Sequence, residues 1–209
     1  MKKFSMLNLV AVRVVSFVAW IYCIAIAVLG LIYQFYPGQD NMSILIGTLP
    51  TVVTMITAFS GPFLMKKLTR KGAVIISLAI SLVCGLTILW MDMSLIGVIL
   101  CSALLGIAAG LIPAANASIV TIVAPTSIKD KVIGWHNAIM MLGMSAFTLL
   151  AGIFAKNGDF RQGYKVVFIL IPVLIITVFL YPNVDKNDLT ETTSVQKENK
   201  NAHNGEKMP

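Results

Sequence analysis

The stretch SGPFLMKKLTRKGAVIIS, residues 60–77, decides the fold, because it sets four cations within six residues between two long apolar runs. The cations are Lys66, Lys67, Arg70 and Lys71. A cluster of this kind fits a nucleic-acid patch, an anchor for lipid headgroups, or a short loop between two helices. The runs on either side decide which of these it is.

The composition of the chain indicates a protein whose solvent is mostly lipid. Of its 209 residues, 57% are apolar and 12% are charged, whereas a soluble domain is about 25% charged. The net charge of +7 would suggest nucleic acid in a soluble protein. Here the cations lie in short segments between apolar runs, and no groove-reading motif accompanies them. We therefore expect an integral protein of the cell membrane, with the lipid bilayer as a partner and no nucleic acid.

Six apolar segments are long enough to cross the hydrocarbon core of a bilayer as helices, which takes about 20 residues. They cover residues 9–33, 44–65, 73–91, 95–124, 132–155 and 164–181. Because the runs are continuously apolar rather than alternating, they argue against a β-barrel. The predicted fold is an all-α bundle of six transmembrane helices over residues 1–182, followed by a polar, disordered tail over 183–209.

The distribution of cations predicts the orientation of these spans. With an even number of spans, the N-terminus, the 66–71 loop, the 129–131 loop and the tail share one side, and they hold 13 of the 16 Lys and Arg residues. Cytoplasmic segments carry the excess of Lys and Arg. We therefore expect both termini in the cytoplasm, and the opening stretch to be the cytoplasmic loop between spans two and three.

The same loop carries a partial sequence motif. Gly61, Lys66 and Arg70 match the first, the first basic and the last positions of a pattern that runs Gly, Asp four residues on, a basic residue, and a Gly-Arg-basic ending. A six-span unit with this loop between its second and third helices resembles the N-terminal half of a major facilitator superfamily transporter. Three positions depart from the pattern, where the family has an acid, a Gly and an Arg: Met65, Leu68 and Thr69.

Three further stretches resemble the same half. Residues 104–120 look like the fourth helix of the family, with small residues and Pro113 in mid-span, and 130–155 look like the following loop and fifth helix. The sixth segment carries a mid-span Pro172, like its family counterpart. The glycine-rich fifth helix is closest in look to drug-export-type members, although it lacks their Gly-Pro pair.

The resemblance implies a function and a partner. Family members move small molecules across membranes, so we expect secondary transport or efflux of a small molecule. Complete members have two six-span halves, and this chain has one, with a tail that resembles the start of the linker between halves. We therefore expect a half-size unit that works with a second half or as a homodimer. The open alternatives are an inactive fragment of a longer transporter and a membrane scaffold that does not transport.

Small residues in the fourth span predict how helices pack. Gly106, Gly110, Ala114 and Ser118 recur every four residues, which forms a stripe where a neighbouring backbone can approach closely. Polar residues elsewhere are candidates for lining a transport pathway: Asn116, Ser102, Thr51 and Thr54. For Asn116 we favour an interhelical hydrogen bond over a substrate contact, and for the threonines a bond to the carbonyl one turn back over a pathway role.

Ionisable residues avoid the middle of the predicted spans. His136 lies near the start of the fifth span, beside Trp135, and we interpret it as an interfacial anchor. No residue for ion coupling is therefore predicted. The sequence also shows no metal-ligand cluster, no nucleotide-binding glycine loop and no nucleophile with a plausible base, so we expect neither an enzyme nor a cofactor.

Overall fold

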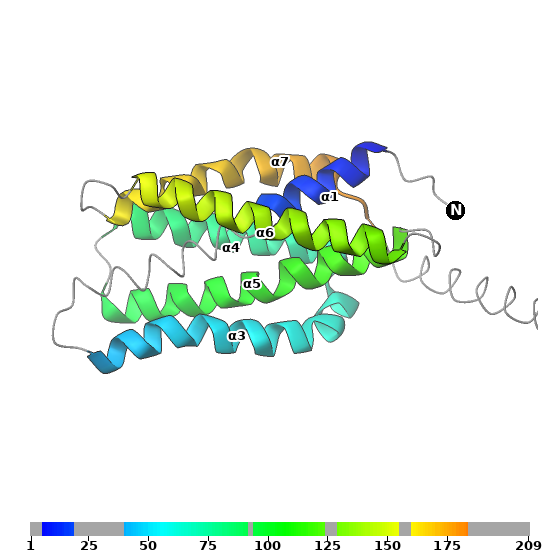
Figure 1. Cartoon of the computed structure of the whole chain (residues 1–209). Coiled ribbons are helices and arrows are strands. Elements are labelled where there is room, and N and C mark those ends of the chain that lie inside the picture. Colours follow the sequence, from blue (N-terminus) through cyan, green and yellow to red (C-terminus); the bar gives the residue numbers. More distant parts are fainter. Residues whose placement is uncertain (1–5, 19–39, 92–93, 124–128, 155–159, 184–209) are drawn as a thin grey trace, which may run out of the picture.

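The computed structural model describes residues 6–18, 40–91, 94–123, 129–154 and 160–183, and these are helical apart from short connections (Figure 1). The prediction of an all-α protein is therefore confirmed for this part of the chain. The elements in chain order are α1 (Met6–Val18), α3 (Asp40–Lys67), α4 (Arg70–Trp90), α5 (Leu95–Val123), α6 (Lys129–Phe154), the 3₁₀ helix η3 (Phe160–Ile169) and α7 (Leu170–Leu180).

Five segments are long and apolar enough to cross a membrane. They are Ile44–Met65, Arg70–Trp90, Leu95–Ile122, Asp130–Phe154 and Arg161–Leu180. The first expected span, over residues 9–33, extends beyond α1, and most of it lies outside the described residues, as does the tail over 184–209. In Figure 1, α1 begins at the end of the bundle where α7 finishes.

The helices form a bundle around α5. α3 lies at one edge and packs mainly on α5, and α5 in turn packs on α4. On the other side, α1 packs on α6 and α7, while η3 packs on α4 and α6 (Figure 1). Leu105, Ile112 and Ile119 of α5 are fully buried, because they lie on the side of α5 that meets its neighbours at helical spacing. α5 is thus the central helix of the bundle.

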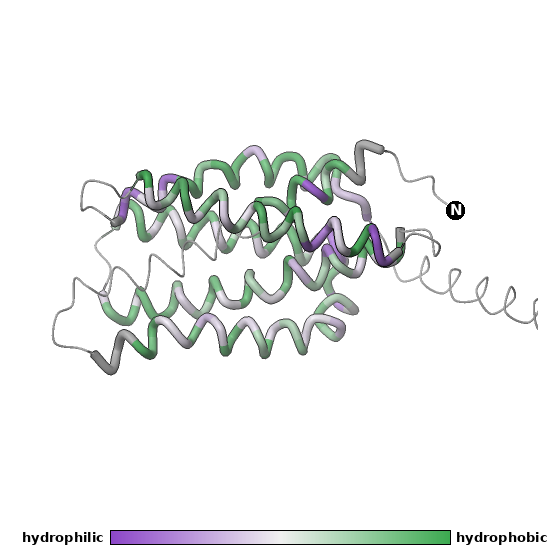
Figure 2. The backbone as a smooth tube through the Cα atoms, viewed as in Figure 1, coloured by the Kyte–Doolittle hydropathy of each residue, from purple (hydrophilic) through white to green (hydrophobic). Residues whose placement is uncertain are grey.

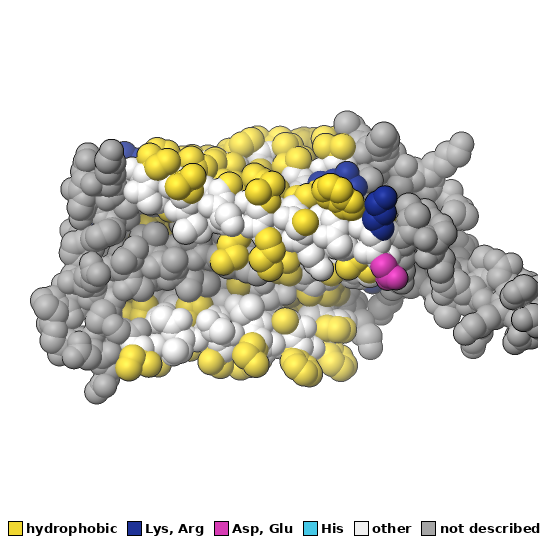
Figure 3. Space-filling model, in the orientation of Figure 1, with side chains coloured by type: hydrophobic (Ala, Val, Ile, Leu, Met, Phe, Trp, Pro, Cys, Tyr) yellow, Lys and Arg dark blue, Asp and Glu magenta, His cyan; other side chains and the backbone are white. Residues whose placement is uncertain are grey.

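Polar residues collect at the two ends of the bundle, and apolar residues cover its length (Figure 2). On the face drawn in Figure 3, hydrophobic side chains spread along the helices, most of the Lys and Arg surface and an acidic side chain gather near one end, and a further cation lies at the other end. This distribution is the one expected when the middle of each helix contacts hydrocarbon and its ends contact water.

The connection between α3 and α4 is shorter than the expected 66–71 loop. α3 continues through Pro62 to Lys67, and α4 begins at Arg70, which leaves Leu68 and Thr69 as the link. Thr69 is the N-cap of α4, and its hydroxyl accepts a hydrogen bond from the backbone N–H of Gly72 at 3.0 Å. The cap explains why the helix restarts so soon and why α3 and α4 reverse direction within two residues.

The sixth expected span, over residues 164–181, coincides with the candidate span Arg161–Leu180, but this span changes helix type along its length. The chain forms η3 over Phe160–Ile169 and becomes α-helical at Leu170. Pro172 has no N–H to bond the carbonyl of Phe168, and its ring would clash with that carbonyl in an α-helix. Pro172 therefore lies in the first turn of α7, where that N–H is not needed, at the place in mid-span where the helix type changes.

Candidate functional site

The backbones of α3 and α5 come close together at two glycines. A methyl group on Gly106 would lie 2.8 Å from the carbonyl oxygen of Pro50. On Gly110 it would lie 2.7 Å from Cβ of Thr57 and 2.8 Å from the carbonyl oxygen of Thr54. Such distances leave no space for a side chain, so glycine is what permits this approach. We call this contact, from Gly106 through Gly110 to Ala114, the α3–α5 seam.

Polar side chains cross the α3–α5 seam and bond to backbone carbonyls. The hydroxyl of Thr54 donates to the carbonyl of Gly106 at 3.1 Å, and the hydroxyl of Ser102 donates to the carbonyl of Ile46 at 3.1 Å. Interhelical hydrogen bonds in membrane proteins contribute about 0.6 kcal/mol each on average. Thr54 and Ser102, two of the candidates for a pathway, are thus engaged in holding α3 on α5.

The seam continues to the short link between α3 and α4. Gly61 of α3 lies beside Ala114, whose Cβ would be 3.4 Å from a methyl group on that glycine. One turn further along α5, Ser118 accepts a hydrogen bond from Nε of Arg70 at 2.8 Å. The structure therefore brings together motif positions and packing positions that the sequence presents separately. Of the motif residues, the side chain of Lys66 lies outside the described part.

Met65 takes the place of the family's acidic residue, and it packs against the apolar core rather than pairing with a charge. Arg70 bonds the neutral hydroxyl of Ser118. A neutral partner gives a weaker contact than a carboxylate would give. The link between α3 and α4 is thus fastened to α5 by a hydrogen bond between an arginine and a serine.

A second set of polar side chains joins helices on the other side of α5. Asn116, fully buried, donates from Nδ2 to the hydroxyl oxygen of Ser16 in α1 at 3.0 Å, and the hydroxyl of Tyr181 donates to Oδ1 of Asn116. Ser16 also lies 3.4 Å from Nδ1 of His136 in α6. We call these four residues the Asn116 network. It ties α1, α5 and α6 to the end of α7.

The position of His136 corrects the interpretation of this residue as an interfacial anchor. Its side chain is 5% exposed and faces Ser16 of α1, inside the bundle. Seven residues of α6 precede it, which places it about 10 Å of helix rise from Lys129. Its Nε2 is buried without a hydrogen-bond partner in the described structure. A buried unpaired acceptor costs about 1–3 kcal/mol, so this atom calls for an explanation.

Sequence reasoning missed the Asn116 network because its members come from four separate segments. Trp135, next to His136, is 60% exposed, because consecutive residues of a helix point in directions about 100° apart. A signal was available in the spacing: Val132, Ile133 and His136 fall on one helical face, and all three are at least partly buried. Periodicity around the histidine, rather than its distance from the end of the span, was the informative feature.

The remaining pathway candidate, Thr51, is exposed on α3. An open groove does occur on the described surface, but on α6, where it is lined by Met144, Ser145, Thr148, Leu149, Gly152 and Ile153. The hydroxyls of Ser145 and Thr148 bond carbonyls of their own helix. The groove is therefore apolar in character, and none of the four candidate pathway residues lines it.

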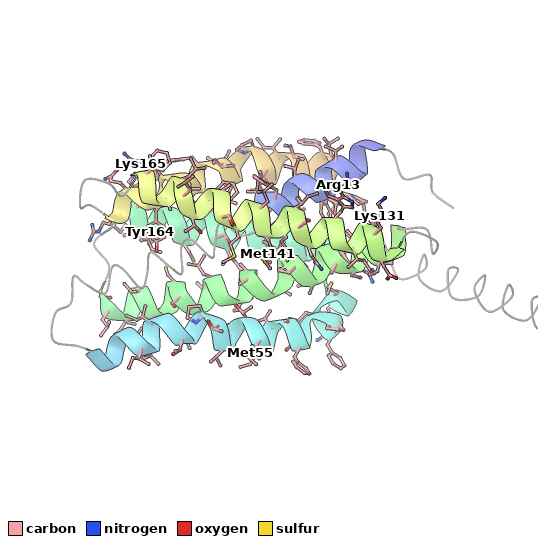
Figure 4. The ribbon with its side chains drawn as sticks, viewed as in Figure 1. Arg13, Met55, Lys131, Met141, Tyr164 and Lys165 are labelled. Atoms are coloured by element: carbon pink, nitrogen blue, oxygen red, sulfur yellow. The ribbon has the colours of Figure 1, made fainter. Side chains whose placement is uncertain are left out.

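The described cations separate to the two ends of the bundle. Figure 4 shows Arg13 and Lys131 toward one end and Lys165 at the other. Lys67, Arg70 and Lys71 flank the α3–α4 link, which lies at the same end as the start of α6 (Figure 1). We call this the basic end.

Five long apolar helices with charged residues toward their ends define a multi-pass membrane protein of the all-α class. The family model of the Major Facilitator Superfamily matches residues 9–204, and the chain belongs to this family. It is therefore a transporter of the major facilitator type. A comparison with curated proteins finds no match.

Proposed function

We propose that the protein carries small molecules out of the cell by secondary transport, as a half-size unit that meets a second six-span unit in the cell membrane. The second unit is either another copy of the chain or a different half. The observation that carries this proposal is the large uncovered apolar surface of α3 and α6. The chain that contains both helices belongs to a family whose members are transporters.

α3 and α6 are the least covered of the five candidate spans. Within an apolar window of 18 residues in each span, 22% of the residues are buried in α3 and in α6, against 56% in α5. The uncovered residues of α3 include large apolar ones, namely Met55, Ile56, Phe59 and Phe63, with Phe59 86% exposed. Hydrophobic association alone gains little in lipid, but large side chains on an edge helix give a second bundle a surface to pack on.

The pathway in this proposal runs along the face where two units meet. Thr51 is exposed on α3 beside Val52 and Met55, so its hydroxyl is available to a substrate there. Asn116, Ser102 and Thr54 make hydrogen bonds inside the unit, and in this proposal they support the helices that form the pathway. Small amphipathic molecules suit a surface that is largely apolar with single hydroxyl groups.

The charge distribution supports the orientation in this proposal. The basic end holds Lys67, Lys71 and Lys131, and Arg161 and Lys165 are the described cations of the opposite end. Under the positive-inside rule the basic end is cytoplasmic. Because α1 begins and α7 finishes at that end (Figure 1), both termini are proposed to lie in the cytoplasm.

Efflux of ethidium from whole cells tests the transport proposal. Cells that express the chain should accumulate less ethidium than cells without it, and cells that express Gly110→Leu should behave like cells without it, because that side chain cannot fit the seam. The control is Val83→Leu, an enlargement at an exposed position of α4, outside the faces of α3 and α6 where the two units are proposed to meet. Unchanged accumulation of ethidium and of a panel of amphipathic drugs, with the protein present in the membrane, would overturn the proposal and favour a scaffold.

A further inference from the structure

The hydrogen bonds around Ser16 favour one position for the hydrogen of a neutral His136. A serine hydroxyl has one proton to donate and two lone pairs to accept with. Ser16 donates that proton to the carbonyl of Val12 at 2.7 Å, and a carbonyl can only accept. With that donation, the lone pairs of Ser16 are open to Nδ2 of Asn116 and to Nδ1 of His136, which lies 3.4 Å away. This arrangement favours a hydrogen on Nδ1 of a neutral His136. Its Nε2 then carries a bare lone pair.

Few ligands can reach this lone pair on Nε2. Nε2 has almost no solvent-accessible surface, and no described group donates to it. Because Nε2 is closed to solvent, a substrate-sized molecule does not reach it in this arrangement of the helices. The smallest ligand of an imidazole lone pair is a proton, and histidine takes up protons near physiological pH.

The charged groups around His136 determine how stable its protonated form would be. From α1, the positive charge of Arg13 acts on His136. α5 contributes the uncharged Asn116, and α7 is followed by Tyr181, a neutral phenol when it donates to Asn116; Arg70 of α4 acts on Tyr181. On α6 itself, Lys131 and Asp130 lie five and six residues before His136, and both are exposed. Among the described residues, no carboxylate takes part in the Asn116 network.

We propose that Nε2 of His136 is a proton-binding site and that its protonation weakens the contact between α1 and α6. An imidazolium in this position would be buried, would face the like charge of Arg13, and would have no counter-ion among the described residues. A proton therefore favours an arrangement of α1 and α6 in which the ring reaches water. The proposal rests on the proposed transport function in one respect, namely that the proton is the ion that couples to transport.

Selective labelling of histidine tests the proton site directly, since the chain has two histidines, His136 and His203. The full chain with ¹⁵N-histidine is placed in lipid nanodiscs, and His203→Gln assigns the signals. We expect His136 to be the Nδ1–H tautomer at neutral pH and to convert to imidazolium as pH falls toward 4. Ser16→Ala, which removes the acceptor, should shift His136 to the Nε2–H tautomer. A neutral Nε2–H tautomer in the wild type, or no protonation down to pH 4, would overturn the proposal.

The coupling of protonation to packing needs a second measurement. Spin labels at Val10 of α1 and Leu142 of α6, both exposed, report the distance between these helices in a background without native cysteines. The distance distribution should change with pH when His136 is present and lose that change in His136→Gln. An unchanged distribution, or the same pH response in His136→Gln, would overturn the proposed effect on α1 and α6.

Ethidium flux into proteoliposomes, with and without a pH gradient, separates the two proposals. A flux that follows the gradient in the wild type and loses that dependence in His136→Gln supports both. Flux without any dependence on the gradient overturns the coupling but leaves transport standing. The expected tautomer and pH-dependent distances without any flux would overturn transport and leave the proton site standing.

Discussion

The two sides of α5 are built on different principles. Toward α3, glycines bring backbones together, and each polar hydroxyl that crosses the seam ends on a carbonyl. Toward α1 and α6, side chains bond to side chains through Ser16, Asn116 and Tyr181. Nε2 of His136 has no hydrogen-bond partner in the described structure. Two helices whose backbones fit closely have one arrangement, whereas side chains in a hydrogen-bonded network can exchange partners. α1 and α6 also share one close backbone contact, between Phe17 and Gly143. The comparison suggests that α3 and α5 move as a unit and that α1 and α6 adjust around that contact.

Of the substitutions on the two sides of α5, one that fills the α3–α5 seam is expected to lower stability most. Gly110→Ala should lower the free energy of unfolding by about 1–3 kcal/mol, because the added methyl meets the backbone of α3. SDS-induced unfolding in lipid bicelles, followed by circular dichroism, measures the change. Gly152→Ala is the matched control, with nothing within 4 Å, and should change stability by about 0.5 kcal/mol or less, or gain from the better helix propensity of alanine. Equal effects at the two glycines would mean that α3 and α5 do not pack as described.

A smaller effect is expected from breaking the Asn116 network. Asn116→Ala removes the bonds to Ser16 and Tyr181, which should cost about 1–2 kcal/mol in the same unfolding assay at the membrane-protein scale for such bonds. Asn137, exposed on α6, provides the control, and Asn137→Ala should leave stability within about 0.5 kcal/mol. If both variants behaved alike, the network would not hold the helices together.

The smallest effect is expected from a single hydroxyl across the seam. Thr54→Val keeps the shape of the side chain and loses the bond to the carbonyl of Gly106, at a cost of about 0.6 kcal/mol. Thr148 bonds within its own helix and is exposed, so Thr148→Val should cost less. The difference between the two variants in the unfolding assay isolates the interhelical bond. A larger loss at Thr148 would contradict the assignment.

Much of the architecture could be predicted from the sequence because lipid imposes few choices. Long apolar runs predict helices, and the repeat of small residues from Gly106 to Ser118 predicts the face of α5 that another helix approaches. The length of the α3–α4 link was missed, since it depends on the capping hydroxyl of Thr69 and not on hydropathy. The break in the sixth span depends on Pro172 near the start of a helix. Its composition predicts a span but not the 3₁₀ turn before it.

The candidate site was less accessible to sequence reasoning. Thr54 and Ser102 were candidates for a pathway by polarity, yet polarity does not say whether a hydroxyl faces a cavity or a neighbouring carbonyl. Arg70 and Ser118, 48 positions apart, meet only once α3, α4 and α5 are packed. His136 was assigned to the interface by its distance from the end of the span, whereas its burial depends on where α1 passes. Tertiary contacts between distant segments determine these properties.

The most direct test of the central proposal is a photo-crosslink from the uncovered faces of α3 and α6 in native membranes. Benzoylphenylalanine at Met55 of α3 or at Met141 of α6, both exposed (Figure 4), should capture a second six-span unit, either a copy of the chain or a different half, identified by mass spectrometry. Phe179 of α7, also exposed, is the control position and should capture lipid. Crosslinks to lipid alone at all three positions would contradict the proposal that this bundle works together with a second one.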